Sequence, residues 1–208
     1  MTKDGPTIAV LDYGMGNLRS VARAIEHVGG RALVTEQSGA ALGADGLVVP
    51  GVGHFGACMR NLRERGLDAV VKDFAASGKP VFGVCVGMQV LFEGSEEAPD
   101  VRGLGLFEGT SRRLPDIVKV PHMGWNVVAW TDVGHRYVED IPDTRFYFVH
   151  SYAPPAPAPG TVGVTIYGMP ISSAVAKDNL FATQFHPEKS GQWGLKLYEG
   201  FIREVSGS

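Results

Sequence analysis

The junction around Cys85, where a predicted strand turns into a predicted helix, constrains the fold more than any other part of the chain. The short apolar run of residues 81–84 predicts a buried strand, and residues 88–92 have the pattern of the first turns of a helix. Gly83 and Gly87 flank the cysteine in the pattern G-x-C-x-G. This spacing matches the nucleophile elbow G-x-S-x-G, with sulfur in place of oxygen.

A sharp turn would hold Cys85 in a strained conformation, and small residues two positions away on each side would let the chain fold that tightly. The helix after the turn would point its N–H groups and the positive end of its dipole at the sulfur, which favours the thiolate. For the match taken alone, a buried structural cysteine is the alternative, because that is the commonest state of a free cysteine. The rest of the chain has to decide between the two.

Composition narrows the class of protein. The 208 residues fit one compact domain, 1–208, and a hydrophobic content of 44% with 20% charged residues is ordinary for a soluble globular protein. The net charge of −3 argues against a nucleic-acid-binding protein, and no apolar run approaches the roughly 20 residues of a membrane span. Residues 1–6 lack the apolar core of a signal peptide, and Cys58 and Cys85 make neither a disulfide framework nor a zinc pattern. We therefore expect a cytoplasmic protein.

The order of predicted elements indicates an α/β fold. In the N-terminal half, strands at 7–11, 32–34, 46–49 and 81–84 alternate with helical patterns at 18–28, 59–62 and 67–74. This alternation predicts a three-layer sandwich with a mostly parallel central sheet. The C-terminal half predicts antiparallel or mixed strands that extend the same sheet, at 104–107, 125–130, 145–149, 161–167, 173–176 and 180–184, with a Pro-rich surface loop at 153–160 and a final helix at 195–205.

The tripeptide His186-Pro187-Glu188 can supply what a cysteine nucleophile needs, a base and a group that orients the base. Because proline disfavours the helical conformation in the residue before it, the tripeptide is predicted to be extended. Its first and third side chains would then point the same way, so that Glu188 fixes the tautomer of His186 while the other ring nitrogen faces Cys85. A surface turn is the alternative for these three residues alone. Together with the elbow, they predict a Cys-His-Glu triad.

The segment Pro50-Gly51-Val52-Gly53 comes after a predicted strand, at the edge of the sheet where open α/β folds bind ligands. Its two glycines would let backbone N–H groups turn toward an oxyanion, together with the N–H of Val86. An ordinary glycine turn is the alternative.

These segments together resemble the class I glutamine amidotransferases and, within that class, the glutaminase subunits of imidazole glycerol phosphate synthases. The resemblance to the class is carried by Pro50-Gly51-Val52-Gly53, Gly83-Val84-Cys85-Val86-Gly87-Met88-Gln89 and Gln184-Phe185-His186-Pro187-Glu188. The narrower resemblance covers about residues 8–202 and is carried by Asp12-Tyr13-Gly14-Met15-Gly16-Asn17-Leu18, Pro50-Gly51-Val52-Gly53-His54-Phe55-Gly56, Pro121-His122-Met123-Gly124-Trp125-Asn126, Phe148-Val149-His150-Ser151-Tyr152 and His186-Pro187-Glu188-Lys189-Ser190. Val86 departs from the family, which more often has leucine there. Since the oxyanion role uses the backbone N–H, we expect little effect.

The resemblance implies a catalytic or binding role for each of several residues. Cys85 would attack the side-chain amide carbon of glutamine, and His186 would protonate the departing ammonia and then activate water to hydrolyse the thioester. The oxyanion would be held by backbone N–H groups near Val52, Gly53 and Val86, and glutamine would be held at Gly51, Gln89, Ser151 and Tyr152. No cofactor and no metal are implied.

The resemblance also implies a partner. The ammonia would pass to a separate (β/α)₈ cyclase subunit, in a heterodimer that makes imidazole glycerol phosphate for histidine biosynthesis. Four residues lie in segments that face the cyclase in the family, and ordinary surface roles are the alternative for each: Asn17, Met123, Trp125 and Lys189.

Several other functions remain to be weighed. Gly14-x-Gly16 with Glu36 invites a dinucleotide fold, but Arg19 stands where the fingerprint needs glycine or alanine. A zinc site from Cys85, His150, His186 and Glu188 lacks the close paired spacing of known zinc sites. The remaining alternatives are the glutaminase subunit of another class I amidotransferase, a non-catalytic relative that acts as a binding protein, and a cysteine peptidase. Glutaminase activity that depends on a partner would distinguish these.

Overall fold

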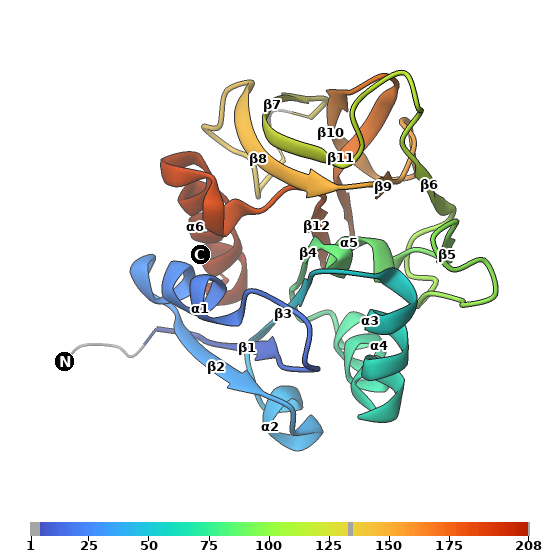
Figure 1. The fold of residues 1–208 in the computed structure, drawn as a ribbon. Helices are drawn as coiled ribbons and strands as arrows, with labels where there is room; N and C mark the ends of the chain where they lie inside the picture. Colours follow the sequence, from blue (N-terminus) through green and yellow to red (C-terminus); the bar gives the residue numbers. More distant parts are fainter. Residues whose placement is uncertain (1–4, 133–134, 208) are drawn as a thin grey trace.

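A nine-stranded sheet forms the centre of the molecule. The computed structural model describes residues 5–132 and 135–207. Figure 1 shows the parallel part of the sheet between two groups of helices and the antiparallel strands extending beyond them. Its strands run in the order β2 (Arg31–Thr35), β1 (Thr7–Leu11), β3 (Gly46–Gly51), β4 (Val81–Cys85), β12 (Leu180–Thr183), β11 (Pro170–Lys177), β10 (Thr161–Ile166), β7 (His122–Trp130) and β8 (Thr144–His150). The first five are parallel and the rest pair antiparallel. The sequence predicts the parallel N-terminal strands and an extension by antiparallel or mixed strands, among which β12 is the one that joins the parallel part.

Helices cover the parallel part of the sheet on both faces. They are α1 (Leu18–His27), α2 (Ser38–Leu42), α3 (Phe55–Glu64), α4 (Leu67–Ser77), α5 (Val86–Leu91) and α6 (Gly191–Ser206). In Figure 1, α1 and α6 lie together on one face, and α3 and α4 lie on the other. Helix α4 ends at Gly78, whose φ of 78° suits glycine, and Pro80 then directs the chain into β4. The short α2 was not predicted, because it buries only Ala41 and so has little apolar periodicity.

The strand predicted at 104–107 is wrong. This segment is irregular, and its N–H groups bond to carbonyls at the end of α5, with Leu104 N 2.8 Å from Val90 O and Leu106 N 2.8 Å from Leu91 O. The last carbonyls of a helix have no partner within the helix, so a neighbouring segment can satisfy them. The segment is apolar because Leu104 and Phe107 are buried, with the ring of Phe107 stacked on that of Phe92 directly after α5. A small second sheet is formed instead by β5 (Gly94–Ser95), β6 (Thr110–Arg113) and β9 (Tyr152–Ala153).

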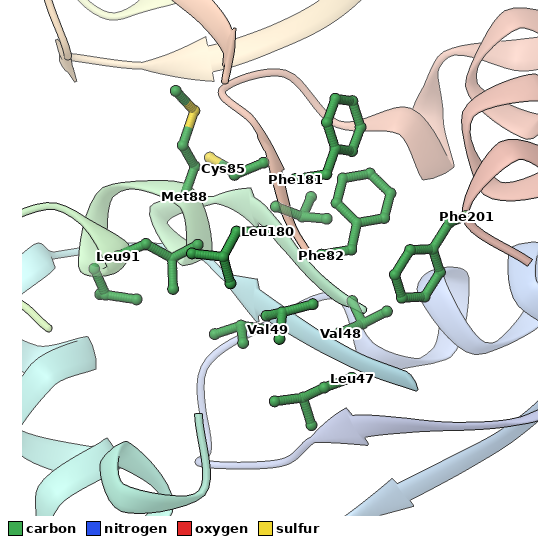
Figure 2. Close-up of a cluster of buried hydrophobic side chains, with 14 of the residues drawn as sticks. Leu47, Val48, Val49, Phe82, Cys85, Met88, Leu91, Leu180, Phe181 and Phe201 are labelled. Carbon is green, nitrogen blue, oxygen red and sulfur yellow. The ribbon is translucent and has the colours of Figure 1, made fainter. Parts of the chain in front are cut away.

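The core beneath the central strands is continuous and rich in aromatic side chains. Every residue of β3 and β4 is buried, as parallel strands covered on both faces require. The ring of Phe82 lies 5.1 Å from that of Phe181 and 5.5 Å from that of Phe201, which joins β4, β12 and α6 (Figure 2). Fully burying each such side chain contributes about 1.5–3 kcal/mol. The carboxyl end of β4, with Cys85, is therefore fixed on a rigid base.

The register of three parallel strands brings distant segments to one edge. Gly51 pairs with Cys85 across β3 and β4, and Thr183 pairs with Val84 across β12 and β4. The segments directly after these strands must therefore meet above the same edge. Of the helices in the described ranges, none has the length and apolar character that crossing a bilayer would need.

Candidate active site

Cys85 occupies the strained turn that the sequence predicts between β4 and α5. Its backbone has a φ of 56° and a ψ of −113°, a conformation that costs a residue with a side chain on the order of 1–3 kcal/mol. A Cβ added at Gly87 would lie 1.8 Å from Val49 O, and one added at Gly83 would lie 2.9 Å from Gly87 O. Both glycines are thus required by close backbone contacts, and the turn holds the thiol at the edge of the sheet.

His186 comes shortly after β12 and reaches the same edge. Its backbone is extended, with φ −102° and ψ 97°, and its N–H donates to Tyr147 O at 2.9 Å. The prediction that the whole tripeptide is extended is wrong, because Pro187–Lys189 forms a 3₁₀ turn, η1. Proline restricts the residue before it, but its own φ suits the first position of a helical turn. The turn still places Glu188 Oε1 2.9 Å from His186 Nδ1.

The electrostatics of this pair favour the imidazolium. Burial alone would disfavour the charged ring, but the neighbouring Cys85 and Glu188 outweigh it and raise the pKa of His186 to about 10. Both side chains are almost fully buried, and Asn17 Nδ2 also donates to Glu188 Oε1 at 3.4 Å. His186 Nε2 has no hydrogen-bond partner within residues 5–132 and 135–207. This nitrogen is therefore free to exchange a proton with a molecule bound beside Cys85.

Two buried side chains hold the loop that the sequence predicts as an oxyanion site. The hydroxyl of Tyr13 donates to Pro50 O, and Cys58 Sγ donates to Val52 O at 3.5 Å. The peptide between Gly51 and Val52 thus lies between two anchored carbonyls.

Glycine is needed on both sides of this peptide. A Cβ added at Gly51 would lie 2.4 Å from Gly87 N, so the loop packs directly against the elbow. Gly53 has a φ of 84°, which is open to glycine but strained for other residues. The sequence predicted the two glycines, but neither Tyr13 nor Cys58 gave a local signal.

One cavity gathers most of the predicted site residues. It is lined by Val52, Gly53, Cys85, Val86, Gln89, Glu97, Val149, His150, Ser151, Tyr152 and His186. Of the catalytic and glutamine-binding residues that the sequence predicts, two do not line this cavity: Glu188 contacts His186 from behind, and Gly51 is the residue of the loop that packs against the elbow. The structure therefore brings together four segments that are far apart in the sequence, at 51–53, 85–89, 151–152 and 186–188.

Gln89 connects the cavity-lining residue Tyr152, by way of Gln184, to the nucleophile Cys85. Its Nε2 donates to Tyr152 O at 2.9 Å and to Gln184 Oε1 at 3.0 Å, and Gln184 Nε2 lies 3.8 Å from Cys85 Sγ. Neither Gln184 nor the cavity-lining Glu97 was predicted as a site residue. Gln184 could have been found as a polar residue at the end of a strand predicted to be buried, whereas Glu97 lies in a loop without a motif.

The four residues predicted to face a partner differ in their exposure and in their contacts. Met123 and Trp125 are 63% and 55% exposed on one side of β7. Trp125 packs edge-on against Tyr147 at 6.1 Å, and the ammonium of Lys189 lies 5.7 Å from the centre of the same ring. Asn17 instead contacts Glu188. Tyr147 was missed, although the alternation of β8 leaves its side chain half-buried.

Two buried histidines lie in contact at one side of the cavity, and one of them, His150, lines it. His122 Nδ1 and His150 Nε2 are 3.0 Å apart, and burial lowers the pKa of His122 to about 4 and that of His150 to about 3. In the parts of the chain that the structure describes, no three His, Cys, Asp or Glu side chains are grouped closely enough to hold a metal ion.

The two histidines predict a loss of stability in mild acid. An unfolded histidine binds a proton near pH 6.5, whereas these two resist it in the folded state, so the free energy of unfolding should fall as pH drops from about 6.5 toward 4. The total effect should be on the order of a few kcal/mol at pH 4. Urea unfolding between pH 7 and 5, where few carboxylates titrate, measures it. The double variant His122→Asn/His150→Asn should have a smaller slope, and an equal slope would contradict the assignment.

Comparison with known proteins gives the class. A sequence model of the family "Glutamine amidotransferase class-I" matches residues 9–204. Among solved structures, a crystal structure of a glutamine amidotransferase has a TM-score of 0.75 at 20% identity and covers 97% of this chain and 99% of its own. The glutaminase domain of Trypanosoma brucei CTPS with bound acivicin has a TM-score of 0.68 at 18% identity, covering 98% and 94%. The match over most of the chain and the shared fold define a class I glutamine amidotransferase.

More similar relatives narrow the class to one family. The imidazole glycerol phosphate synthase subunit HisH of Acinetobacter baylyi is 49% identical over 199 residues, which cover 94% of this chain and 97% of that protein. The subunit of the same name from Aromatoleum aromaticum is 51% identical over 208 residues, covering 94% and 97%. The chain belongs to this family of HisH subunits.

Proposed function

We propose that this chain hydrolyses glutamine through Cys85, His186 and Glu188 and supplies the ammonia to a cyclase subunit that makes imidazole glycerol phosphate in histidine biosynthesis. One observation carries the proposal. Cys85, in its strained elbow, lines the same cavity as the buried imidazole of His186. Nε2 of His186 has no hydrogen-bond partner among the described residues, and its Nδ1 is bonded to the carboxylate of Glu188. That arrangement is what covalent catalysis by a thiol needs.

The first half of the reaction releases ammonia. The Cys85 thiolate attacks the amide carbon of glutamine, and a sulfur–carbon bond forms while the carbonyl becomes an oxyanion. We assign the stabilisation of that charge to the backbone N–H groups of Val52, Gly53 and Val86, three residues that line the cavity together with Cys85. His186, with its raised pKa, carries the proton that the leaving nitrogen needs, so the carbon–nitrogen bond breaks and ammonia departs.

The second half restores the enzyme. His186 is now neutral and accepts a proton from water, whose oxygen attacks the thioester carbon. The carbon–sulfur bond breaks, glutamate leaves and the thiolate returns beside the imidazolium. Glu188 keeps its charge throughout, because its role is to orient the ring and stabilise the imidazolium.

The cavity can hold the rest of the glutamine molecule. Gln89 and the backbone of Ser151 and Tyr152 form one wall of the cavity. Gly51 lies in the loop that packs against the elbow. The α-ammonium of glutamine needs an anionic partner, and Glu97 is the acidic residue that lines the cavity. We assign Glu97 that role.

The partner is proposed to dock on the face that carries Trp125. Exposed Met123 and Trp125 form a patch with Tyr147, and aromatic and methionine side chains are enriched at interaction surfaces. The ammonium of Lys189 lies over the ring of Tyr147. Asn17 donates to Glu188 Oε1 at 3.4 Å, and Glu188 directly precedes Lys189 in the chain. A partner that contacts Asn17 or Lys189 would therefore lie next to Glu188, the residue that orients His186.

Glutamate release with and without a (β/α)₈ cyclase subunit loaded with its ribotide substrate tests the function. The isolated chain should be slow and the loaded complex much faster, because ammonia released without an acceptor is lost. Trp125→Ala should weaken the complex, whereas the control Leu42→Ala, an exposed leucine on α2 at the opposite end of the sheet, should not. Full activity in the isolated chain, unchanged by the partner, would indicate a free-standing glutaminase.

A further inference from the structure

His150 lines the cavity but has no part in the triad. Its Nδ1 lies 3.0 Å from Tyr152 O, and because a carbonyl oxygen only accepts, Nδ1 must carry the hydrogen and donate. In the neutral ring the other nitrogen, Nε2, is then an acceptor. The atom that faces it is His122 Nδ1 at 3.0 Å, which must therefore be the donor.

The same reasoning fixes His122. With its hydrogen on Nδ1, its Nε2 must accept, and the partner there is the amide Nδ2 of Asn126 at 3.3 Å, which can only donate. The low pKa values of both histidines agree, because only neutral rings allow this arrangement. A second proton on His150 would set two N–H groups against each other. A single set of tautomers thus satisfies every hydrogen bond from Asn126 to Tyr152.

The Tyr152 carbonyl is also bonded from the other side. Gln89 Nε2 donates to it at 2.9 Å and connects onward through Gln184 to Cys85. The oxygen has two lone pairs, and one is taken by His150 and the other by Gln89. The orientation of the Tyr152 carbonyl, and with it the backbone of this cavity-lining residue, is therefore set by two side chains, one of which belongs to the histidine pair.

We propose that His150, held by His122, is a positioning residue for glutamine, which fixes the Ser151–Tyr152 backbone as the wall against which the substrate lies. This rests on the proposed glutaminase function. Because the wall contacts bound glutamine before and during the reaction, losing its support should raise KM more than it lowers kcat. His122 also lies on the buried side of β7, whose exposed side carries Met123 and Trp125.

Three variants of His150 separate the hydrogen bond from the bulk of the ring. His150→Leu removes the donor at similar volume and should raise KM for glutamine about tenfold, the effect of losing one buried hydrogen bond. His150→Asn places its amide nitrogen near the position of Nδ1, so it should restore KM to within about threefold of wild type. His150→Gln puts its donor nearer the position of Nε2 and should not restore it. All are assayed in the loaded complex with the cyclase subunit.

Two controls complete the experiment. His135→Leu removes another partly buried histidine, one whose Nδ1 accepts from Tyr137 N and which does not line the cavity, and it should leave KM unchanged. Alkylation of Cys85 by iodoacetamide should be equal in wild type and His150→Leu, which shows that the nucleophile is intact. If His150→Leu does not fold, His122→Leu decides, with an expected rise of KM of about threefold.

The outcomes distinguish this inference from the proposed function. An active wild-type enzyme with the same KM in His150→Leu, or equal defects in the asparagine and glutamine variants, would overturn the positioning role alone. A wild-type complex that releases no glutamate would overturn the glutaminase function. In that case glutamine binding by calorimetry, compared between wild type and His150→Leu, still decides whether the histidine supports the cavity wall.

Discussion

Replacing Cys85 with alanine is expected to reduce glutamine hydrolysis by roughly 10³-fold to 10⁶-fold, because the sulfur forms the covalent intermediate and the triad acts as a unit. The fold should survive, since the change removes one atom at the edge of the cavity, and alanine has the same backbone restrictions as cysteine. Glutamate release in the loaded complex measures the loss. An activity within tenfold of wild type would show that Cys85 is not the nucleophile.

Chemical labelling gives an independent check within the same molecule. A glutamine-analogue electrophile should modify Cys85 and spare Cys58, which serves as an internal control. Cys58 is fully buried, bonded to the Val52 carbonyl, and burial raises its pKa to about 12, so it remains a thiol. Equal labelling of the two cysteines would contradict the elbow assignment.

His186→Ala should be nearly as damaging as the loss of Cys85, since the imidazole both donates the proton to ammonia and activates water. Its Nε2 is the buried nitrogen beside the nucleophile that has no partner among the described residues. Steady-state glutamate release, with the folded state checked by urea unfolding, measures the effect. Retention of the thioester intermediate in this variant would be consistent with a failure of the water step.

Glu188→Gln should do less harm than His186→Ala. The amide oxygen can still accept from His186 Nδ1, so the ring keeps its orientation, but the charge that stabilises the imidazolium is lost. The variant should therefore keep substrate binding and lose kcat. If Glu188→Gln were the worse lesion, the roles assigned to the two residues would be wrong.

Local patterns predicted the parts of the site that local chemistry determines. The elbow at Cys85 and the glycines around Val52 reflect backbone geometry that few residues can adopt, so a short motif identifies them. The pair His122 and His150 could not be predicted in this way. They meet because β7 and β8 pair in a register that sets one opposite the other, and register depends on the whole sheet.

The two errors have the same origin. An apolar run at 104–107 is equally consistent with a strand and with an irregular segment that caps a helix, and only the neighbouring α5 decides between them. The conformation of Pro187 likewise depends on a later residue, because Ser190 Oγ donates to His186 O and so closes the turn. Tyr13 and Gln184 were missed because their partners are remote in the sequence.

The pairing of β4 with β12 has a consequence for synthesis on the ribosome. Cys85 and Gln184 are neighbours in space but 99 residues apart in the chain, so the nucleophile leaves the ribosome long before the histidine two residues beyond Gln184. Parallel pairing over such a separation is slow, because the entropy of closing the loop opposes it. A nascent or truncated chain therefore carries a cysteine without its base, and the thiol acquires a proton acceptor only when the last parallel strand docks. The order of translation therefore leaves Cys85 without its base until the C-terminal strand has folded beside it.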